Sequence, residues 1–269
     1  MLKWLKDLVP TPLKTVVKLN LLARKEFANL SPAASRVALS GVDILMRLYG
    51  HGQGSPRNAQ GKPIPWYSYP AIEALSALDF RQCQVFEYGA GGSTQWWSER
   101  SHRVCSVESD PGWYSRVEKR LQSNATIILR TEIGVYSRAV EEFDQEFDVI
   151  VVDGLGGNFA RFECCLHAIA YLRKGGLLIL DNSDYLPRSC EMLRQRGLLQ
   201  VDYDGLVPQN EVAGRTSFFY SLPFSIPRQA HRFALGGAAT DWERDDDPAN
   251  TRSFASLCEE AVCRRAVSP

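Results

Sequence analysis

The residues with the clearest chemical potential lie between positions 85 and 108. The stretch Val85–Ser98 predicts a buried strand, a tight glycine turn and a helix start, with Glu87 two residues before Gly89. Backbone amides of a glycine-lined turn suit a pyrophosphate, whereas a carboxylate at this place suits a cationic ligand better. Glu108 ends the next apolar run, close to the ~20 residues that one strand–helix–strand step needs before an acid can reach a ribose.

Together these features resemble the S-adenosylmethionine (SAM) site of class I methyltransferases, over roughly residues 66–222. The resemblance implies that Glu87 supports the methionine end of SAM through the loop and that Glu108 binds the ribose hydroxyls. The simpler structural alternative is that the glycines only let strand and helix pack closely. The implied cofactor-binding residues are Glu87, Gly89, Ala90, Gly91, Ser93, Thr94, Glu108 and Asp153.

Polar side chains follow two further predicted strands. Asp153 closes the strand predicted over 147–153, and Asp181 with Asn182 follows the strand predicted over 177–180. Open α/β sheets bind ligands at the carboxyl ends of their strands, and neighbouring strands lie ~4.8 Å apart, so these side chains can converge. Two carboxylates and an amide oxygen suit magnesium. The arrangement is similar to the metal positions of catechol and caffeoyl-CoA O-methyltransferases, where the metal lowers the pKa of the hydroxyl that is methylated.

One departure from that family concerns the general base. Those enzymes carry a lysine shortly after the first aspartate, and the segment Gly154–Asn158 has none, so the base stays unassigned. In the alternative interpretation Asp153 closes the SAM pocket, Asp181 and Asn182 form a turn, and Ser183 or Asp184 caps the following helix. In both interpretations Asp153 is our candidate catalytic residue, because it lies where the acceptor must be aligned.

The elements that must position these residues alternate between strands and helices. Continuous apolar strands alternating with helices predict a Rossmann-like, doubly wound α/β fold, with a mostly parallel seven-stranded sheet and helices on both faces. The strands are predicted over 84–88, 103–108, 125–129, 147–153 and 177–180, with a closing pair over 199–203 and 217–221. The helices are predicted over 70–80, from a Ser93 or Thr94 cap to Arg100, after an Asp110 cap, and from Phe159 to near Gly175. Trp66–Tyr69 precede the first helix and could form either a lid or hinge packing.

The composition limits the number of domains and the partners. A chain of 269 residues that is 45% hydrophobic can bury one α/β core plus extensions. We assign residues 61–222 to the methyltransferase domain, residues 1–60 to a basic amphipathic arm and linker, and residues 223–269 to a partly disordered extension. Lysine plus arginine equals aspartate plus glutamate at 31 each, so we expect a small-molecule partner and no nucleic acid.

The cysteines and the N-terminus bear on location. Seven cysteines without a CxxC pair are typical of reduced packing residues, which predicts a cytoplasmic protein. No apolar run reaches the ~20 residues of a membrane span, and no signal peptide is apparent. The apolar stripe of the arm is interrupted by Pro10 and Pro12 and flanked by lysines. We expect it to dock on the catalytic domain, with peripheral contact at the inner membrane surface as the alternative.

The predicted function is SAM-dependent O-methylation of a small-molecule or sugar hydroxyl, with magnesium as an additional expected cofactor. Methyl transfer from a sulfonium is an in-line displacement, to which a protein contributes by aligning the acceptor and excluding water. One alternative is an NAD(P)-dependent oxidoreductase, which Glu87 and the lack of a clear Tyr–Lys or Cys–His pair disfavour. The other is a non-catalytic SAM-binding or scaffold protein of the same fold.

Overall fold

The computed structural model describes residues 55–58, 61–155, 158–209 and 213–229. The predicted basic arm up to residue 54 and the predicted extension from residue 230 lie outside these residues. Within the described part, no helix is both long and apolar enough to cross a bilayer.

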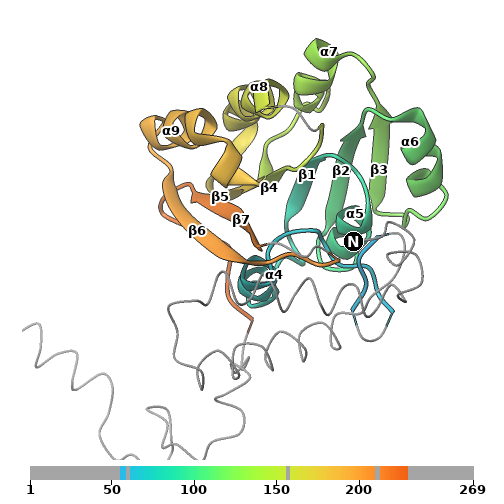
Figure 1. Cartoon of the computed structure of the whole chain (residues 1–269), viewed down its shortest axis with the longest axis horizontal. Helices are drawn as coiled ribbons and strands as arrows, with labels where there is room; N and C mark the ends of the chain where they lie inside the picture. Colours follow the sequence, from blue (N-terminus) through green and yellow to red (C-terminus); the bar gives the residue numbers. More distant parts are fainter. Residues whose placement is uncertain (1–54, 59–60, 156–157, 210–212, 230–269) are drawn as a thin grey trace, which may run out of the picture. The chain divides into compact units, whose positions relative to one another are not determined.

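A single seven-stranded sheet organises the described residues (Figure 1). The strand order is β3-β2-β1-β4-β5-β7-β6, in which β1 to β5 are parallel and β7 runs antiparallel to both β5 and β6. The strands are β1 (Gln84–Tyr88), β2 (Arg103–Glu108), β3 (Ala125–Leu129), β4 (Phe147–Val152), β5 (Leu172–Asp181), β6 (Leu199–Leu206) and β7 (Ala213–Tyr220). The predicted mostly parallel, Rossmann-like sheet is confirmed.

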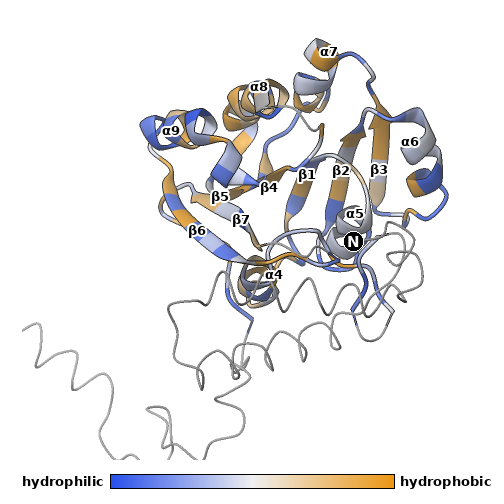
Figure 2. Ribbon diagram, in the orientation of Figure 1, coloured by the Kyte–Doolittle hydropathy of each residue, from blue (hydrophilic) through white to orange (hydrophobic). Residues whose placement is uncertain are grey.

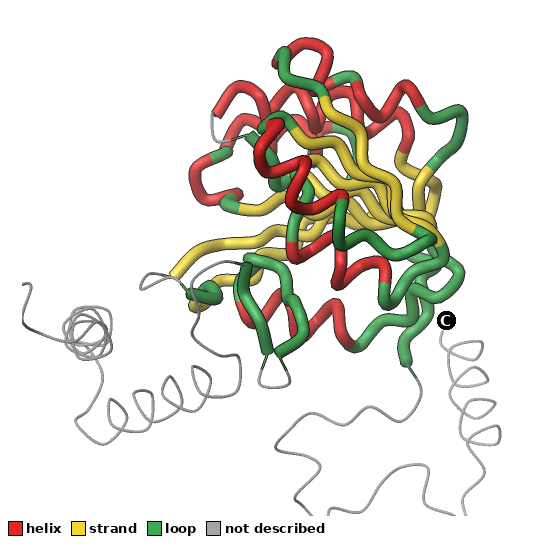
Figure 3. Tube along the Cα trace, turned by 90° about the vertical axis from the view of Figure 1, so that its right-hand side faces the viewer, coloured by secondary structure: helices red, strands yellow, loops and turns green. Residues whose placement is uncertain are grey.

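Helices cover both faces of this sheet, so that the strands lie between helical layers (Figure 3). Side chains of α4, α5 and α6 pack on one face, and those of α7, η1, α8 and α9 pack on the other. The helices are α4 (Tyr69–Ser76), α5 (Gly92–Ser98), α6 (Pro111–Glu118), α7 (Ile133–Ser137), α8 (Asn158–Ala168) and α9 (Pro187–Gln195), with short 3-10 turns η1 (Ala139–Glu142), η2 (Ile169–Tyr171) and η3 (Ser183–Tyr185). The doubly wound arrangement is confirmed.

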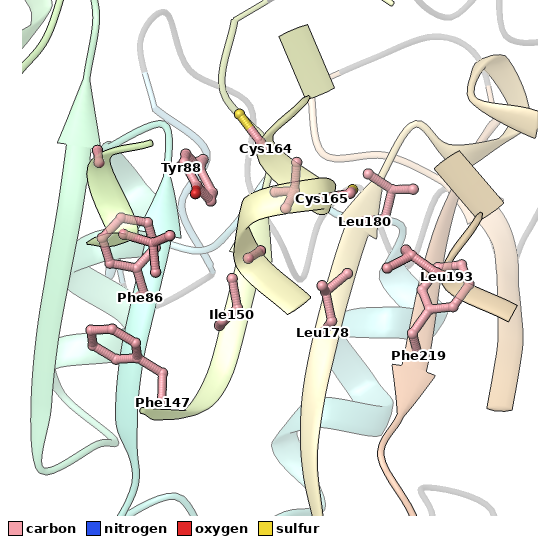
Figure 4. Close-up of a cluster of buried hydrophobic side chains, with 14 of the residues drawn as sticks. Phe86, Tyr88, Phe147, Ile150, Cys164, Cys165, Leu178, Leu180, Leu193 and Phe219 are labelled. Carbon is pink, nitrogen blue, oxygen red and sulfur yellow. The ribbon is translucent and has the colours of Figure 1, made fainter. Parts of the chain in front are cut away.

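The core follows from strands that are apolar on both sides, as the hydropathy colouring shows (Figure 2). Alternate residues of one strand enter different clusters: Phe86 and Tyr88 face α7 to α9, whereas Val85 faces α4 and α5. Figure 4 shows the first cluster, in which Ile150 and Leu178 of the central strands meet Cys165 of α8. Glu87, Glu108 and Asp181, the buried acids of the sheet, lie near the carboxyl ends of their strands.

Several predicted boundaries were wrong, and β5 shows the physical reason most clearly. The glycine pair Gly175–Gly176 was predicted to end a helix, but α8 ends at Ala168 and β5 begins at Leu172. The pairing of β5 with β4 shifts register here, so the glycines form an irregularity within the strand. Gly175 has a φ of +83°, and a Cβ on Gly176 would lie 2.6 Å from the carbonyl oxygen of Asp148. Glycine therefore marks a bulge and not a strand start.

The first helix and the closing pair also differ from prediction. Helix α4 ends at Ser76, short of the predicted residue 80, while β6 continues to Leu206 and β7 begins at Ala213. The chain after β7 packs back on the domain: the Gln229 amide donates to Ala77, and Ile226 is buried among the residues of α4. Residues 223–229, which we assigned to the extension, thus complete the α4 side of the core.

Candidate functional site

The site begins at the turn that leaves β1. Strand β1 lies between β2 and β4, and the chain order reverses there, which is where open α/β sheets bind their ligands. Gly89 has a φ of +91°, and a Cβ there would lie 2.6 Å from Gly154 Cα in the loop after β4. Two loops therefore cross at backbone contact, which only glycine at position 89 permits.

The backbone amides of residues 89 to 91 in this loop all donate hydrogen bonds within the protein. The Gly89 amide donates to the Val107 carbonyl at 2.9 Å, the Ala90 amide to Glu108 Oε2 at 3.1 Å, and the Gly91 amide to Thr94 Oγ1 at 2.8 Å. The predicted Ser93 or Thr94 cap is corrected in position, since Gly91 is the N-cap residue and Thr94 lies in the first turn of α5. The loop thus presents satisfied amides, unlike a loop that binds phosphate through free N–H groups.

Glu87 lies fully buried beneath the loop. The register of β1 with β2 places it beside Ser106, and Thr94 and Ser106 donate to its Oε2 at 2.5 and 3.0 Å. Its Oε1 accepts no hydrogen bond from a described residue. Burial raises the pKa of Glu87 to about 7, although the hydroxyls of Thr94 and Ser106, which donate to Oε2, oppose this shift. A buried carboxyl with one unsatisfied oxygen is an environment that a nearby cation would stabilise.

Glu108 joins the end of β2 to the same loop. Besides the Ala90 amide, it accepts the amides of Ser109 and Asp110 on Oε1 at 2.7 and 2.8 Å. Asp110 caps α6 as predicted, accepting the Trp113 amide, and the Trp113 indole donates to the Ala90 carbonyl at 2.5 Å. The loop is therefore clamped from the β2 side by a carboxylate and an indole.

The acids after β4 and β5 converge as predicted. Pairing of β4 with β5 aligns Val152 with Leu180, so that Asp153 and Asp181 follow at adjacent strand ends. The centre of the cluster is a residue that the sequence did not single out, Arg161 of α8. Its Nη2 lies 3.3 Å from Asp153 Oδ1, and its Nη1 donates to Asn182 Oδ1 at 3.0 Å.

Arg161 uses all five of its N–H donors in this cluster. The remaining three contacts are to main-chain carbonyls of Gly154, Asp181 and Asp153, at 2.9, 2.6 and 3.2 Å. A guanidinium offers five donors in a fixed planar geometry, so this side chain is saturated. It ties the loop after β4 to the end of β5.

The two carboxyl groups of the cluster differ in their surroundings. Thr216 lies opposite Asp181 in the β5–β7 register and donates to its Oδ1 at 2.6 Å. Burial and the nearby Asp153 charge raise the pKa of Asp181 well above its usual range, and burial also raises the pKa of Asp153, while Arg161 opposes the rise at both carboxyl groups. The Asp153 side chain is 19% exposed. The rise in pKa is greater at Asp181, which therefore holds a proton more readily than the partly exposed Asp153.

This arrangement does not fit the predicted magnesium site. Asp153, Asp181 and Asn182 lie together, but a guanidinium occupies the place that the cation was expected to take. Among the described residues no cluster of three or more His, Cys, Asp or Glu side chains could hold a metal. The magnesium prediction is corrected: the cluster is neutralised by Arg161.

We therefore expect no saturable magnesium binding at this cluster. Titration of the protein with MgCl2 in a calorimeter at pH 7.5 should give only heats of dilution, because the carboxylate charge is already paired and the amide oxygen is already bonded. The Asp153→Asn variant provides the control. A one-to-one isotherm that this substitution removes would restore the metal site.

Other residues near the site come from the Trp66–Tyr69 segment and from β7. Tyr67 is fully buried and its hydroxyl accepts from the Trp97 indole at 3.3 Å; burial, with the charges of Glu87, Asp153 and Asp181, raises its pKa. The Ser68 amide donates to Thr216 Oγ1 at 3.0 Å. Tyr67, Ser68 and Tyr69 are buried, which supports the packing interpretation for these three residues, whereas Trp66 is exposed. Local sequence carries no signal for Arg161 or Thr216, because each reaches the site through tertiary packing.

Comparison with known proteins gives fold similarity only. No family model and no curated protein matches the chain. Solved structures that resemble it include an rRNA methylase from Streptococcus thermophilus, with 16% identity, a TM-score of 0.45 and coverage of 57% of this chain and 96% of that one. A precorrin-6y C5,15-methyltransferase from Geobacter metallireducens has 14% identity, a TM-score of 0.45 and coverage of 56% and 87%. The N-methyltransferase NodS from Bradyrhizobium japonicum, in complex with S-adenosyl-L-homocysteine, has 15% identity, a TM-score of 0.38 and coverage of 52% and 78%. At this similarity, function has to be inferred from the residues of the chain itself.

Proposed function

We propose that the chain is a SAM-dependent methyltransferase that acts on a hydroxyl oxygen of a small molecule. The observation that carries the proposal is the charge of the glycine loop. Two buried carboxylates, Glu87 and Glu108, lie against a loop whose amides at positions 89 to 91 are bonded internally. A dinucleotide pyrophosphate would meet acids and satisfied amides there, whereas SAM brings a sulfonium and an ammonium. The loop therefore favours SAM over NAD(P).

The residues present fit SAM in two respects. The unsatisfied Oε1 of Glu87 is a buried acceptor that a cationic group can compensate. Glu108 is held by three backbone amides at the end of β2, the position from which an acid reaches a ribose. In this proposal Glu87 supports the amino-acid end through the loop, Glu108 accepts a ribose hydroxyl, and Gly89, Ala90, Gly91, Ser93 and Thr94 shape the pocket.

Asp153 is the proposed acceptor-positioning group. When bound, SAM supplies a methyl carbon that the acceptor oxygen attacks, while the carbon–sulfur bond breaks with its electron pair on sulfur and the hydroxyl loses its proton. Arg161 holds Asp153 in place and opposes the rise in its pKa that burial causes, and part of the Asp153 side chain remains exposed. An ionised carboxylate in this position can accept the hydrogen bond of the acceptor hydroxyl and take its proton.

Calorimetric titration tests the cofactor assignment. We expect SAM and S-adenosylhomocysteine to bind with micromolar affinity and NAD⁺ to give no saturable heat. Release of S-adenosylhomocysteine in the presence of an acceptor separates an enzyme from a binding protein. Saturable NAD⁺ binding without SAM binding would refute the proposal and favour the oxidoreductase.

We expect Glu108→Ala to weaken SAM binding by about 1.5–3 kcal/mol, the range for hydrogen bonds to a charged group. The substitution removes both the ribose acceptor and the anchor of the Ala90 amide. Isothermal titration with SAM measures the change, and circular dichroism checks the fold. Glu118→Ala on α6 is the matched control, because Glu118 is exposed and bonds only Tyr114 among the described residues. Equal affinities for the two variants would remove Glu108 from the site.

A further inference from the structure

A cleft with an aromatic lining lies between the start of α8 and the segment of η3 and α9. It has a volume of about 370 Å³ and is lined by Phe159, Phe162, Tyr185, Leu186, Pro187, Arg188 and Ser189. Small-molecule sites commonly measure ~300–1,000 Å³, so the cleft can hold a ring-bearing small molecule. Phe159 and Tyr185 are 69% and 70% exposed, which is unusual for aromatic side chains that could have packed inside.

The two walls of the cleft are held together by the cluster described above. Phe159 and Phe162 flank Arg161 in α8, and Tyr185 ends the short turn η3 that follows Asn182. Arg161 bonds Asn182 Oδ1 and the Asp181 carbonyl, so it ties α8 to the chain that leads into η3. The cleft therefore lies between two segments that follow the carboxyl ends of β4 and β5, and Arg161 joins these segments.

The lining indicates the chemistry of the occupant. The rings of Phe159 and Phe162 lie 6.2 Å apart and are inclined by only 31° to each other, which presents an aromatic wall suited to a flat ring. The lining contains one cation, Arg188, and no carboxylate. The Arg188 side chain makes no hydrogen bond or ion pair with another described residue, whereas the Arg194 side chain of the same helix pairs with Glu191. An aromatic wall beside an unpaired guanidinium suits a ring that carries an anion.

We propose that this cleft binds an aromatic carboxylate, with the ring against Phe159 and Phe162 and the carboxylate on Arg188. The inference rests on the proposed function in one respect: the bound aromatic acid is the class of acceptor, and its hydroxyl is the group that is methylated. Binding of the aromatic acid itself depends only on the cleft.

The test compares an acid with its neutral amide. Calorimetry on the full chain measures the affinities of 6-hydroxy-2-naphthoate and 6-hydroxy-2-naphthamide for the wild type and three variants. We expect the wild type to bind the acid about fivefold more tightly than the amide, as for a solvent-accessible ion pair. Arg188→Gln should abolish this preference, and Phe159→Ala should weaken both ligands by similar factors. Arg196→Gln, which changes an exposed arginine at the end of α9 outside the lining, should behave as wild type.

The outcomes test the aromatic-acid cleft and the proposed methyltransferase function separately. Equal binding of acid and amide to the wild type, a preference that survives Arg188→Gln, or no binding of either compound overturns the cleft proposal. A parallel SAM titration keeps the proposed function separate. If SAM binds and the naphthoate does not, only the cleft assignment fails. If the naphthoate binds with the expected preference and SAM does not, the methyltransferase assignment fails while the aromatic-acid site stands.

Discussion

Replacing Arg161 by methionine should destabilise the protein by about 3–5 kcal/mol at pH 7.5, the cost of leaving a buried charge without its partner. Methionine replaces the aliphatic part of the side chain but removes all five N–H donors, which serve Asp153, Asn182 and three main-chain carbonyls. The variant would then lack the hydrogen bonds by which Arg161 joins the loop after β4 to the end of β5. Urea denaturation followed by circular dichroism measures the free energy of unfolding.

The loss in Arg161→Met should depend on pH in a defined direction. Arg161 opposes the rise in the pKa of Asp153 that burial causes, so without the guanidinium Asp153 takes up a proton at higher pH. The loss in the free energy of unfolding is then largest at high pH, where Asp153 must ionise, and it becomes smaller as the pH falls towards 5. Adding Asp153→Asn to the variant should recover part of the loss at pH 7.5.

The matched control is Arg194→Met on α9. Arg194 is also an arginine in a helix, but its pair with Glu191 is exposed, so its removal should cost at most ~1 kcal/mol. If Arg161→Met costs no more than Arg194→Met, the cluster is not a stabilising centre. Retained stability would also reopen the question of what neutralises Asp153 and Asp181.

The fold was largely predictable because its signals are local. Strands such as Gln84–Tyr88 and Arg103–Glu108 are short apolar runs with turn residues on either side, and their bounds agree with the structure. The prediction was wrong at Gly175 and Gly176 of β5. A glycine pair commonly ends a helix or strand, but here it forms a bulge within the strand. A glycine signals unusual backbone geometry, but the sequence does not say which geometry.

The site was predictable only where the sheet itself creates it. Asp153 and Asp181 could be paired in advance because parallel strands bring their carboxyl ends to one edge. Arg161 could not, since it lies eight residues after Asp153 on a helix whose rotation and depth are set by packing. The same acids without their partner resemble a metal site. The identity of a counter-ion is thus a tertiary property, even when the anions are visible in the sequence.

The stability of the protein should fall as pH rises from about 4.5 to about 7, in part because of Glu87. Burial raises the pKa of this carboxyl from 4.5 to about 7. Below 4.5 it is protonated in the folded and unfolded states alike; between the two values the unfolded chain releases the proton while the folded chain retains it. Above 7 the penalty levels off at about 3 kcal/mol, since each unit of pKa difference is worth ~1.4 kcal/mol.

Glu87→Gln isolates this contribution because glutamine does not titrate and its amide oxygen can still accept from Thr94 and Ser106. The variant should gain stability relative to the wild type as pH rises through this window, by up to about 3 kcal/mol. Urea denaturation of both proteins between pH 4.5 and 8.5 measures the difference. Glu118→Gln, an exposed residue of α6, should show no such trend. A difference that does not change with pH would mean that Glu87 is not the titrating group.

Binding of a cationic ligand should have the opposite pH dependence to stability: it should become stronger as the pH rises and Glu87 ionises. A positive charge beside Glu87 favours the ionised carboxylate, so binding of SAM becomes easier as the free protein loses the Glu87 proton. For a free-state pKa of about 7, the affinity of the wild type relative to Glu87→Gln should rise about tenfold between pH 6 and pH 8. The α-amino group of the ligand also titrates near ~7.7–8.0, but it does so equally with both proteins, and the ratio of affinities cancels it. If the ratio of the two affinities does not change with pH, the cationic part of the ligand lies away from Glu87. The argument that this buried acid selects SAM over a dinucleotide would then be wrong.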